Sequence, residues 1–353
     1  MISRRLFIGA AGAIAIPTGK TSRTSPASSP YRVELPAPTG RHAIGTRELH
    51  LVDHGRPDPW RSGPRELMVS LWFPALQLPG PRAPYAGSAV APALATEMAG
   101  YLRLSGDTVD LAGSLTHARR NAPVVRPGPT LLYSPGSGAS RVIGTNQAEE
   151  LASHGYLVIT VDHTGEAPVE FPGGRVVMPH IPWEDPVAVR TATDTRVADI
   201  RFVLNRLRVN RAGMFGYSMG GAAAASAMLV DRRIRVGVNL DGGMYDGDQP
   251  SEVARTGLDR PFLLFGAGDH SRATDPSWKS FWEAQRGWKR EELLTDGGHG
   301  SLGDYQFTLP ALARLNGVPS GALEPGLGTV DPAVAVARVR RAVRGVFGYF
   351  LKP

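Results

Sequence analysis

Short runs of hydrophobic residues recur along most of the chain, separated by polar or glycine-rich turns. In residues 66–74, every second position from Leu67 to Phe73 is apolar, which is typical of a β-strand with one face in a core. A run at 46–53 predicts a neighbouring strand, and proline and glycine between the two mark a loop. Six later runs predict further strands, at 130–134, 157–162, 212–216, 235–240, 262–266 and 291–295.

Hydrophobic residues spaced three and four apart predict helices between most of these strands. The clearest example is 191–207, and residues 145–154 form another predicted helix that stops at Gly155. Because helices alternate with strands, the sequence predicts an α/β fold. Its central sheet is mainly parallel and is flanked by helices on both faces.

One segment interrupts the alternation. Residues 75–128 are rich in alanine and proline, with a helical stretch around 91–104 and no clear core strand. We interpret this segment as an excursion that could wall the active site. The rest of the pattern shows no repeat and predicts a single domain over 31–353, long enough to bury a sizeable core.

The strongest chemical signal lies where the predicted strand at 212–216 gives way to a helix. Residues 216–220 have the sequence Gly-Tyr-Ser-Met-Gly, followed by a run of small residues. A serine nucleophile on a sharp strand-to-helix turn needs neighbours without bulk at the positions two before and two after it. The helix that follows would direct its positive end at a developing oxyanion. This context predicts that Ser218 is a nucleophile.

Two other residues complete the expected order of a Ser-Asp-His triad. Asp241 directly follows the strand at 235–240, and His299 follows the last predicted strand. Ligands bind at the carboxyl ends of the strands in such sheets, so all three side chains are expected at one rim. There the aspartate would orient the imidazole, which would take the serine proton.

The order of residues leaves alternatives open for the acid and the base. Asp269 follows the next strand and would serve as well on order alone. His270 and His163 are alternatives to His299, although neither follows the last strand.

Tetrahedral intermediates of acyl transfer need two backbone donors. The N–H of Met219, directly after the nucleophile, is one expected donor. The other should come from the glycine-rich loop at 133–138, in which Ser137 N–H is the favoured candidate. This loop lacks the Gly-Lys-Ser/Thr of a phosphate-binding loop, and we expect no cofactor and no metal.

Composition narrows the function further. The chain of 353 residues carries a formal net charge of +7 without a basic block interleaved with aromatics, so nucleic acid is not an expected partner. The densest basic stretch, 338–344, lies in an amphipathic helical pattern. It is interpreted as a solvated face, with peripheral contact to a membrane or lipid surface as the alternative. The chain has no cysteine, which excludes disulfides, thiol catalysis and thiolate metal sites.

The first residues predict export. Arg4 and Arg5 form a twin-arginine pattern before a mildly apolar stretch at 9–16, which is too short to span a bilayer. Residues 13–15, Ala-Ile-Ala, offer a cleavage option, and 20–30 has the composition of a disordered lead-in. We therefore expect a twin-arginine signal peptide and lead-in over 1–30, and an extracellular or cell-envelope location.

From about Leu35 onward the chain resembles the bacterial relatives of plasma-type platelet-activating factor acetylhydrolase, within the α/β-hydrolase superfamily. The segments that carry the resemblance are 67–74, 134–138, 151–156, 216–220 and 240–244. The resemblance implies a secreted serine esterase without a metal. It also implies Asp241 as the acid, His299 in a His-x-x-x-x-Asp loop, and Ser137 as the second oxyanion donor.

The chain departs from the family at Pro135-Gly136, where relatives often have His-Gly. The elbow and the residue order also resemble cutinases and polyester hydrolases. Those enzymes place their acid where Asp269 lies and usually carry disulfides.

The substrate is the least determined part of the prediction. Trp278, Phe281 and Trp282 have helical spacing and are interpreted as core. Four residues flank the proposed site and could line an apolar acyl pocket: Tyr217, Met219, Met244 and Tyr245. The chain is expected to be an esterase or lipase that acts on short or oxidised acyl chains. The alternatives are a polyester hydrolase and an inactive hydrolase-fold binding protein.

Overall fold

The computed structural model describes residues 29–352 of the chain. The twin-arginine pattern, the cleavage option and most of the 20–30 stretch lie outside these residues. Within 29–352, no helix has both the length and the apolar character needed to cross a membrane.

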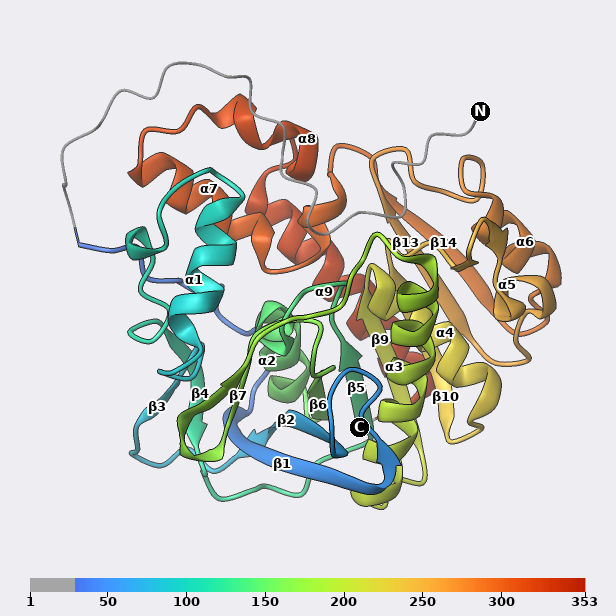
Figure 1. Ribbon diagram of the computed structural model, residues 1–353, viewed down its shortest axis with the longest axis horizontal. Helices are drawn as coiled ribbons and strands as arrows, with labels where there is room; N and C mark the ends of the chain where they lie inside the picture. The colour runs from blue at the N-terminus through green and yellow to red at the C-terminus, as the bar shows by residue number, and fades with distance from the viewer. Residues whose placement is uncertain (1–28, 353) are drawn as a thin grey trace.

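A twisted sheet of ten strands forms the centre of the molecule, in the order β14-β13-β10-β9-β5-β6-β2-β1-β4-β3 (Figure 1). Its strands are β1 (Ala43–Pro57), β2 (Pro64–Ala75), β3 (Arg82–Pro84), β4 (Leu115–Arg120), β5 (Thr130–Ser134), β6 (Leu157–Asp162), β9 (Ala212–Tyr217), β10 (Ile234–Leu240), β13 (Phe262–Ala267) and β14 (Lys289–Leu294). Two small hairpins lie outside it, β7 (Val169–Phe171) with β8 (Arg175–Val177), and β11 (Tyr245–Asp246) with β12 (Gln249–Pro250).

The six strands from β14 to β6 run parallel to one another, as the alternation of strands and helices predicts. β2 joins β6 in the antiparallel sense and forms a long hairpin with β1. The prediction of a mainly parallel sheet is therefore confirmed. All six carboxyl ends of the parallel strands lie at the same edge of the sheet.

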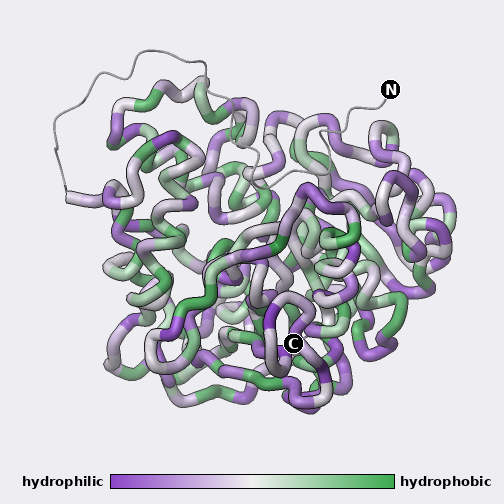
Figure 2. Tube along the Cα trace, viewed as in Figure 1, coloured by the Kyte–Doolittle hydropathy of each residue, from purple (hydrophilic) through white to green (hydrophobic). Residues whose placement is uncertain are grey.

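The helices are α1 (Ala91–Gly100), α2 (Thr145–Ser153), α3 (Pro186–Arg206), α4 (Met219–Val230), α5 (Glu252–Thr256), α6 (Pro276–Ala284), α7 (Tyr305–Leu315), α8 (Glu324–Leu327) and α9 (Pro332–Phe350). Short 3₁₀ turns are η1 (Gly106–Thr108), η2 (Arg141–Gly144), η3 (Pro172–Gly174), η4 (His299–Leu302) and η5 (Ser320–Leu323). α2 and α9 cover the face that includes Leu131 and Tyr133, while α3 to α6 cover the opposite face, which includes Leu132. Hydrophilic residues predominate along the outer turns (Figure 2).

The excursion at 75–128 differs from its prediction in one respect. It contributes two sheet strands that the sequence does not predict, β4, which pairs in parallel with β1, and β3, which pairs with β4, although neither is an apolar core strand. β4 has the sequence Leu-Thr-His-Ala-Arg-Arg, in which only Thr116 and Ala118 are buried. A polar strand such as β4, which lies next to the edge strand β3, has no apolar run by which it could be recognised.

The helix of the excursion, α1, packs against α7 and the start of the described chain (Figure 1). Tyr31, Val33 and Leu35 share this satellite core. Arginines add ties to backbone carbonyls: Arg340 on α9 donates to the carbonyls of Ala37 at 2.7 Å and Pro36 at 2.8 Å. The segment before β1 is thereby fixed to both α7 and α9.

Candidate active site

Ser218 occupies the turn between β9 and α4 in a backbone conformation that side-chain-bearing residues rarely adopt, with φ 55° and ψ −127°. The glycines around it are required by space. A Cβ atom on Gly216 would lie 2.1 Å from the carbonyl oxygen of Gly220, and one on Gly220 would lie 2.0 Å from that of Ser134. The strain exposes the serine hydroxyl above the sheet, as a nucleophile elbow does.

His299 and Asp241 meet Ser218 at this edge. His299 Nε2 lies 3.0 Å from Ser218 Oγ, and His299 Nδ1 lies 2.6 Å from Asp241 Oδ2. A carboxylate accepts hydrogen bonds, so Nδ1 carries a proton and Nε2 is free to accept from the serine hydroxyl. The structure brings together the three side chains that the sequence order predicts.

The other candidates lie elsewhere. Asp269 is exposed on the loop after β13, and it is Asp241 that contacts His299. Asp241 is buried, with φ 62°, and its backbone N–H donates to Phe265 O at 2.9 Å. This unusual backbone turns the carboxylate from the end of β10 toward the loop that follows β14.

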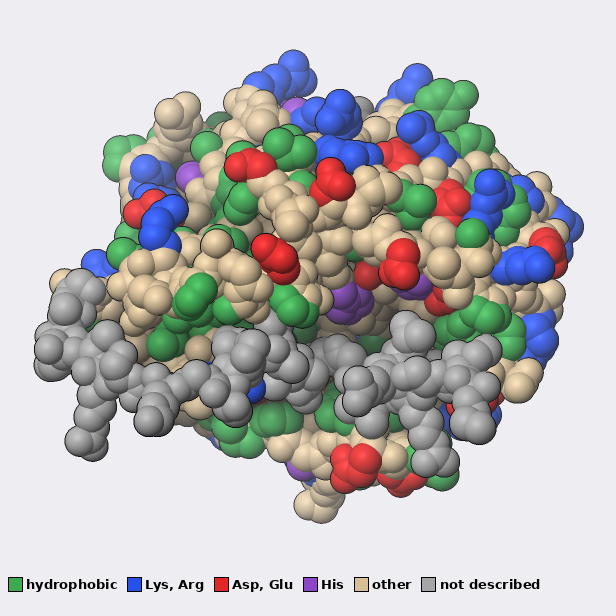
Figure 3. All heavy atoms as spheres, turned by 90° about the horizontal axis from the view of Figure 1, so that it is seen from above, with side chains coloured by type: hydrophobic (Ala, Val, Ile, Leu, Met, Phe, Trp, Pro, Cys, Tyr) green, Lys and Arg blue, Asp and Glu red, His purple; other side chains and the backbone are tan. Residues whose placement is uncertain are grey.

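The site is open to solvent on the side of His299. That side chain is 38% exposed, whereas the Asp241 side chain is 4% exposed. Figure 3 shows histidine side chains in a hollow on this face of the molecule, next to acidic side chains. A substrate can therefore reach the imidazole, while the carboxylate behind it is shielded from water.

A second histidine contacts the same carboxylate. His270 Nδ1 lies 2.8 Å from Asp241 Oδ1, and its Nε2 lies 2.8 Å from Asp275 Oδ2. Both ring nitrogens face carboxylate oxygens, so both must carry protons, and His270 is an imidazolium. From the sequence, His270 is considered only as an alternative to His299 as the base. In the structure both histidines contact Asp241, His270 through Oδ1 and His299 through Oδ2.

Burial and hydrogen bonding together set the pKa values of His270 and Asp241. Burial lowers the pKa of His270, but hydrogen bonds to Asp241 and Asp275 outweigh burial and raise the pKa to about 9. Burial raises the pKa of Asp241, but hydrogen bonds from His270 and His299 outweigh it and lower the pKa to about 2. Asp275 offsets the positive charge of His270, so the negative charge of Asp241 remains available to His299.

The glycine-rich loop after β5 lies beside the nucleophile. A Cβ atom on Gly136 would lie 3.4 Å from the Cβ of Ser218 and 3.0 Å from the ring of Tyr217. The other expected donor, Met219 N–H, is at the first residue of α4, where backbone N–H groups lack helical acceptors. The two segments expected to supply oxyanion donors thus flank Ser218.

Comparison with known proteins identifies the family of the chain. No protein-family model matches the chain. The chain is 30% identical over 359 residues to a probable 1-alkyl-2-acetylglycerophosphocholine esterase of Arthroderma benhamiae, covering 92% of this chain and 90% of that protein. The present chain therefore belongs to the platelet-activating factor acetylhydrolase-like esterases. The family resemblance predicted from the sequence is therefore confirmed.

Solved structures extend the comparison. A ferulic acid esterase from Streptomyces cinnamoneus superposes with a TM-score of 0.77 and 38% identity, covering 90% of this chain and 93% of that one. A dienelactone hydrolase-like promiscuous phosphotriesterase from metagenomic libraries, with a TM-score of 0.50 and 14% identity over 87% of this chain and 99% of that one, shares the fold. This platelet-activating factor acetylhydrolase-like protein is a carboxylic ester hydrolase of the α/β-hydrolase fold.

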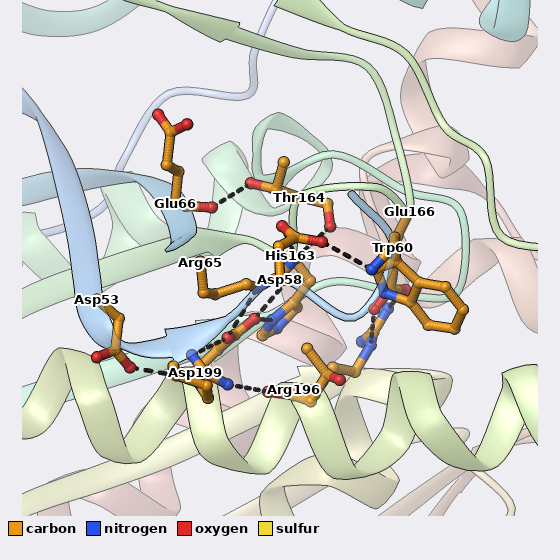
Figure 4. Close-up of polar contacts among 12 residues, drawn as sticks. Asp53, Asp58, Trp60, Arg65, Glu66, His163, Thr164, Glu166, Arg196 and Asp199 are labelled. Atoms are coloured by element: carbon orange, nitrogen blue, oxygen red, sulfur yellow. Dashed lines mark hydrogen bonds and ion pairs between the residues drawn. The ribbon is translucent and has the colours of Figure 1, made fainter. Parts of the chain in front are cut away.

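The esterase contains a second, buried Ser-His-Asp arrangement, of which Figure 4 shows His163 and Asp199. His163 Nε2 lies 2.9 Å from Ser134 Oγ, and His163 Nδ1 lies 3.0 Å from Asp199 Oδ2. All three side chains are buried, and Arg196 donates to the hydroxyl of Ser134 at 3.2 Å. With its oxygen occupied and water excluded, Ser134 lacks the access that a nucleophile needs. His163 is therefore a structural histidine in this esterase.

Of the four residues proposed to line an acyl pocket, Tyr217 and Met219 are partly in place to do so, whereas Met244 and Tyr245 have other roles. Tyr217 stacks near His299 with ring centroids 4.9 Å apart, and Met219 packs on the surface of α3. Met244 is wrong as a pocket residue, because it is buried in the core beneath α5 and α6. Tyr245 donates its hydroxyl to Asp275 at 2.7 Å, which makes it a support for the His270 pair.

The aromatic residues of α6 are largely core, as predicted. Trp278 and Phe281 are fully buried, and Trp282 packs at the margin of the same cluster. Trp278 also lies under the site: its indole N–H donates to Gly242 O at 2.7 Å, and its ring is 4.3 Å from that of His270.

Among residues 29–352, no cluster of metal-ligating side chains is arranged to hold an ion.

The raised pKa of His270 predicts a pH-dependent stability. The folded-state pKa of about 9 lies above the ordinary value of 6.5. Its contribution is therefore fully present below about pH 6.5 and is lost as the pH rises through about 9. We expect the free energy of unfolding, measured by urea denaturation from pH 6 to 10, to lose at most about 3 kcal/mol by this route.

The His270→Gln variant should lack that pH-dependent part, because glutamine does not titrate. His54→Gln, at an exposed histidine, controls for loss of an imidazole. Parallel pH profiles for wild type and His270→Gln would contradict a charged His270.

Proposed function

We propose that this esterase cleaves carboxylic esters through an acyl-enzyme formed on Ser218. The observation that carries the proposal is the continuous path from Ser218 Oγ to His299 to Asp241, with distances of 3.0 Å and 2.6 Å. In the first step His299 Nε2 takes the serine proton while Oγ attacks the ester carbonyl carbon. Asp241 stabilises the imidazolium that forms and keeps its ring in place.

Collapse of the tetrahedral intermediate breaks the bond to the alcohol oxygen, and the imidazolium of His299 donates its proton to that oxygen. Water then attacks the acyl-enzyme with His299 as the base again, which releases the carboxylic acid and restores Ser218. The N–H groups of Ser137 and Met219 would bind the oxyanion in both steps. Their support is the position of the two segments on either side of Ser218.

For the substrate, we propose esters with a short acyl group. The fungal relative is named for an acetyl ester of a glycerophosphocholine. A second candidate is an ester of an aromatic hydroxycinnamic acid, favoured by the name of the Streptomyces structure and its 38% identity. A polyester hydrolase and an inactive binding protein remain the alternatives that the tests below distinguish.

For the location, we propose export by the twin-arginine route. The support is the Arg4-Arg5 pair ahead of a short apolar stretch. This route delivers a folded chain, and a protein without cysteine needs no disulfides after transit.

The Asp241→Asn variant should lose turnover about 10⁴-fold, because an amide holds the wrong tautomer of His299. Asp269→Asn should stay close to wild type, since its side chain is exposed and away from His299. The measurement is kcat on p-nitrophenyl acetate, with a fluorophosphonate probe that labels wild type but not Ser218→Ala. A reversed order of the two aspartate variants would assign the acid to Asp269, and an unlabelled wild type would favour the binding protein.

A substrate series separates the ester classes. We expect kcat/KM for p-nitrophenyl esters to fall by roughly tenfold or more from butyrate to octanoate, because a site for short chains discriminates by methylene groups. A 2-acetyl phosphocholine lipid, methyl ferulate and a polyester film complete the series, with Ser218→Ala as the blank. Methyl ferulate as the best substrate would establish the second candidate, and rising activity with chain length would rule out the short-acyl proposal.

Export is tested by changing Arg4 and Arg5 to lysine together. In a bacterial host with a twin-arginine pathway, the wild-type chain should appear outside the cytoplasm, and the double variant should accumulate inside. Arg23→Lys, which leaves the pair intact, is the matched control. Export is measured by immunoblotting of cell fractions. Equal export of all three forms would contradict the proposed route.

A further inference from the structure

Arg196 is a fully buried arginine in the middle of α3, and the proposed mechanism assigns it no role. Figure 4 shows its side chain rising from the helix beside Glu166, and its guanidinium contacts the loop that follows β5. A charged group in such a place costs free energy unless every donor is satisfied. The hydrogen-bond acceptors of Arg196 therefore indicate which part of the protein its guanidinium holds in place.

Each of the five N–H donors of Arg196 has an acceptor. Nε donates to Glu166 Oε1 at 2.8 Å, and one donor of Nη2 binds the other carboxylate oxygen, so the pair is bidentate. The remaining Nη2 donor binds Gly136 O at 2.9 Å. Nη1 donates to Pro135 O and to Ser134 Oγ. One guanidinium thus holds two successive carbonyl groups of the loop beside Ser218.

The planarity of the peptide bond turns these contacts into an orientation. In a trans peptide the C=O of one residue and the N–H of the next point in opposite directions, and residues 29–352 contain no cis peptide. Because Arg196 binds the carbonyl of Gly136, the N–H of Ser137 must point away from the guanidinium. The same holds for the carbonyl of Pro135 and the N–H of Gly136.

The position of the loop indicates what those N–H groups face. Gly136 is so close to Ser218 that an added Cβ would lie 3.4 Å from the serine Cβ. The carbonyl of Gly136 also accepts from Ala139 N–H at 3.2 Å, which closes a turn around Ser137. A rotation of the Gly136–Ser137 peptide would therefore break contacts with both Arg196 and Ala139.

We propose that Arg196, held by Glu166, is a positioning residue that aims the Ser137 N–H at the oxyanion. The inference rests on the proposed function, since it concerns the oxyanion hole of the same acyl transfer. Arginine is required because its planar fork reaches both carbonyls and the carboxylate at once. Lysine would keep the charge beside Glu166 but has three donors on a single nitrogen.

Arg196→Lys tests the proposal, with Arg260→Lys as its matched control. Arg260 is also buried and donates to backbone carbonyls, those of Met228, Asp231 and Ile234, but at the far end of α4. Both variants should lower the melting temperature. Only Arg196→Lys should reduce kcat on p-nitrophenyl acetate, by about 10²-fold, as loss of one oxyanion donor does.

A trifluoromethyl ketone supplies the readout that a merely structural role would not move. It forms a tetrahedral adduct with the serine, so its affinity should fall in Arg196→Lys by the same factor as kcat, with KM nearly unchanged. Equal kcat and inhibitor affinity in folded Arg196→Lys and wild type would overturn the proposal. A loss confined to KM would do so as well.

If Arg196→Lys does not fold, Glu166→Gln decides. Its amide replaces one of the two oxygens that accept from Arg196 Nε and Nη2 with an NH₂ group, which cannot accept a hydrogen bond. The bidentate pair is lost in either amide orientation, so kcat and inhibitor affinity should fall together, by about tenfold for a tilted donor. An unchanged kcat in this variant would count against the proposal. If wild type is active and every folded variant is labelled by the fluorophosphonate, the Ser218 mechanism holds. A failure of the Arg196 proposal is then distinguishable from a failure of the proposed function.

Discussion

The Asp241 carboxylate is the point on which the arrangement of the site depends. It sits at the end of β10 with a positive φ, accepts hydrogen bonds from His299 and His270, and also accepts the backbone N–H of Ala267 at 2.8 Å. Each bond fixes one direction of a planar group with two oxygens. The carboxylate therefore has one orientation, and through it His299 has one orientation toward Ser218. Burial strengthens these interactions because water does not compete for the oxygens.

Two charge pairs, one fully and one partly buried, support the site from different elements. His270 and Asp275 hold the acid from the loop after β13, while Arg196 and Glu166 hold the glycine-rich loop after β5. In each pair a carboxylate neutralises a cation that contacts the site residues, so neither adds a net charge to the hollow where an ester would bind. Such pairs contribute little net stability when compared with apolar packing. Their place in this fold is explained better by the orientations they impose.

The sequence predicted the framework well because the information is local. Five of the parallel strands, β5, β6, β9, β10 and β13, are short, largely apolar runs, whereas β14 is apolar only at its last two residues. The glycines at 216 and 220 mark a turn with no room for side chains. β4 escaped prediction because a polar strand that ends in two arginines has no such run. His270 and Arg196 escaped for a different reason. A loop histidine and an arginine on an amphipathic helix are usually solvated, and no spacing in the sequence tells which side of Asp241 a ring occupies or that a guanidinium lies beneath a loop 60 residues away.

Arginines bound to main-chain oxygens recur in this fold at Arg196, Arg260 and Arg340, each joining segments that are remote along the chain. In a polypeptide without cysteine, these guanidinium clamps fasten loops and helix ends much as covalent cross-links do elsewhere. They differ in one respect: a guanidinium neither gains nor loses electrons and keeps its proton across the biological pH range. These contacts are consequently independent of the thiol–disulfide balance of the compartment in which the chain folds.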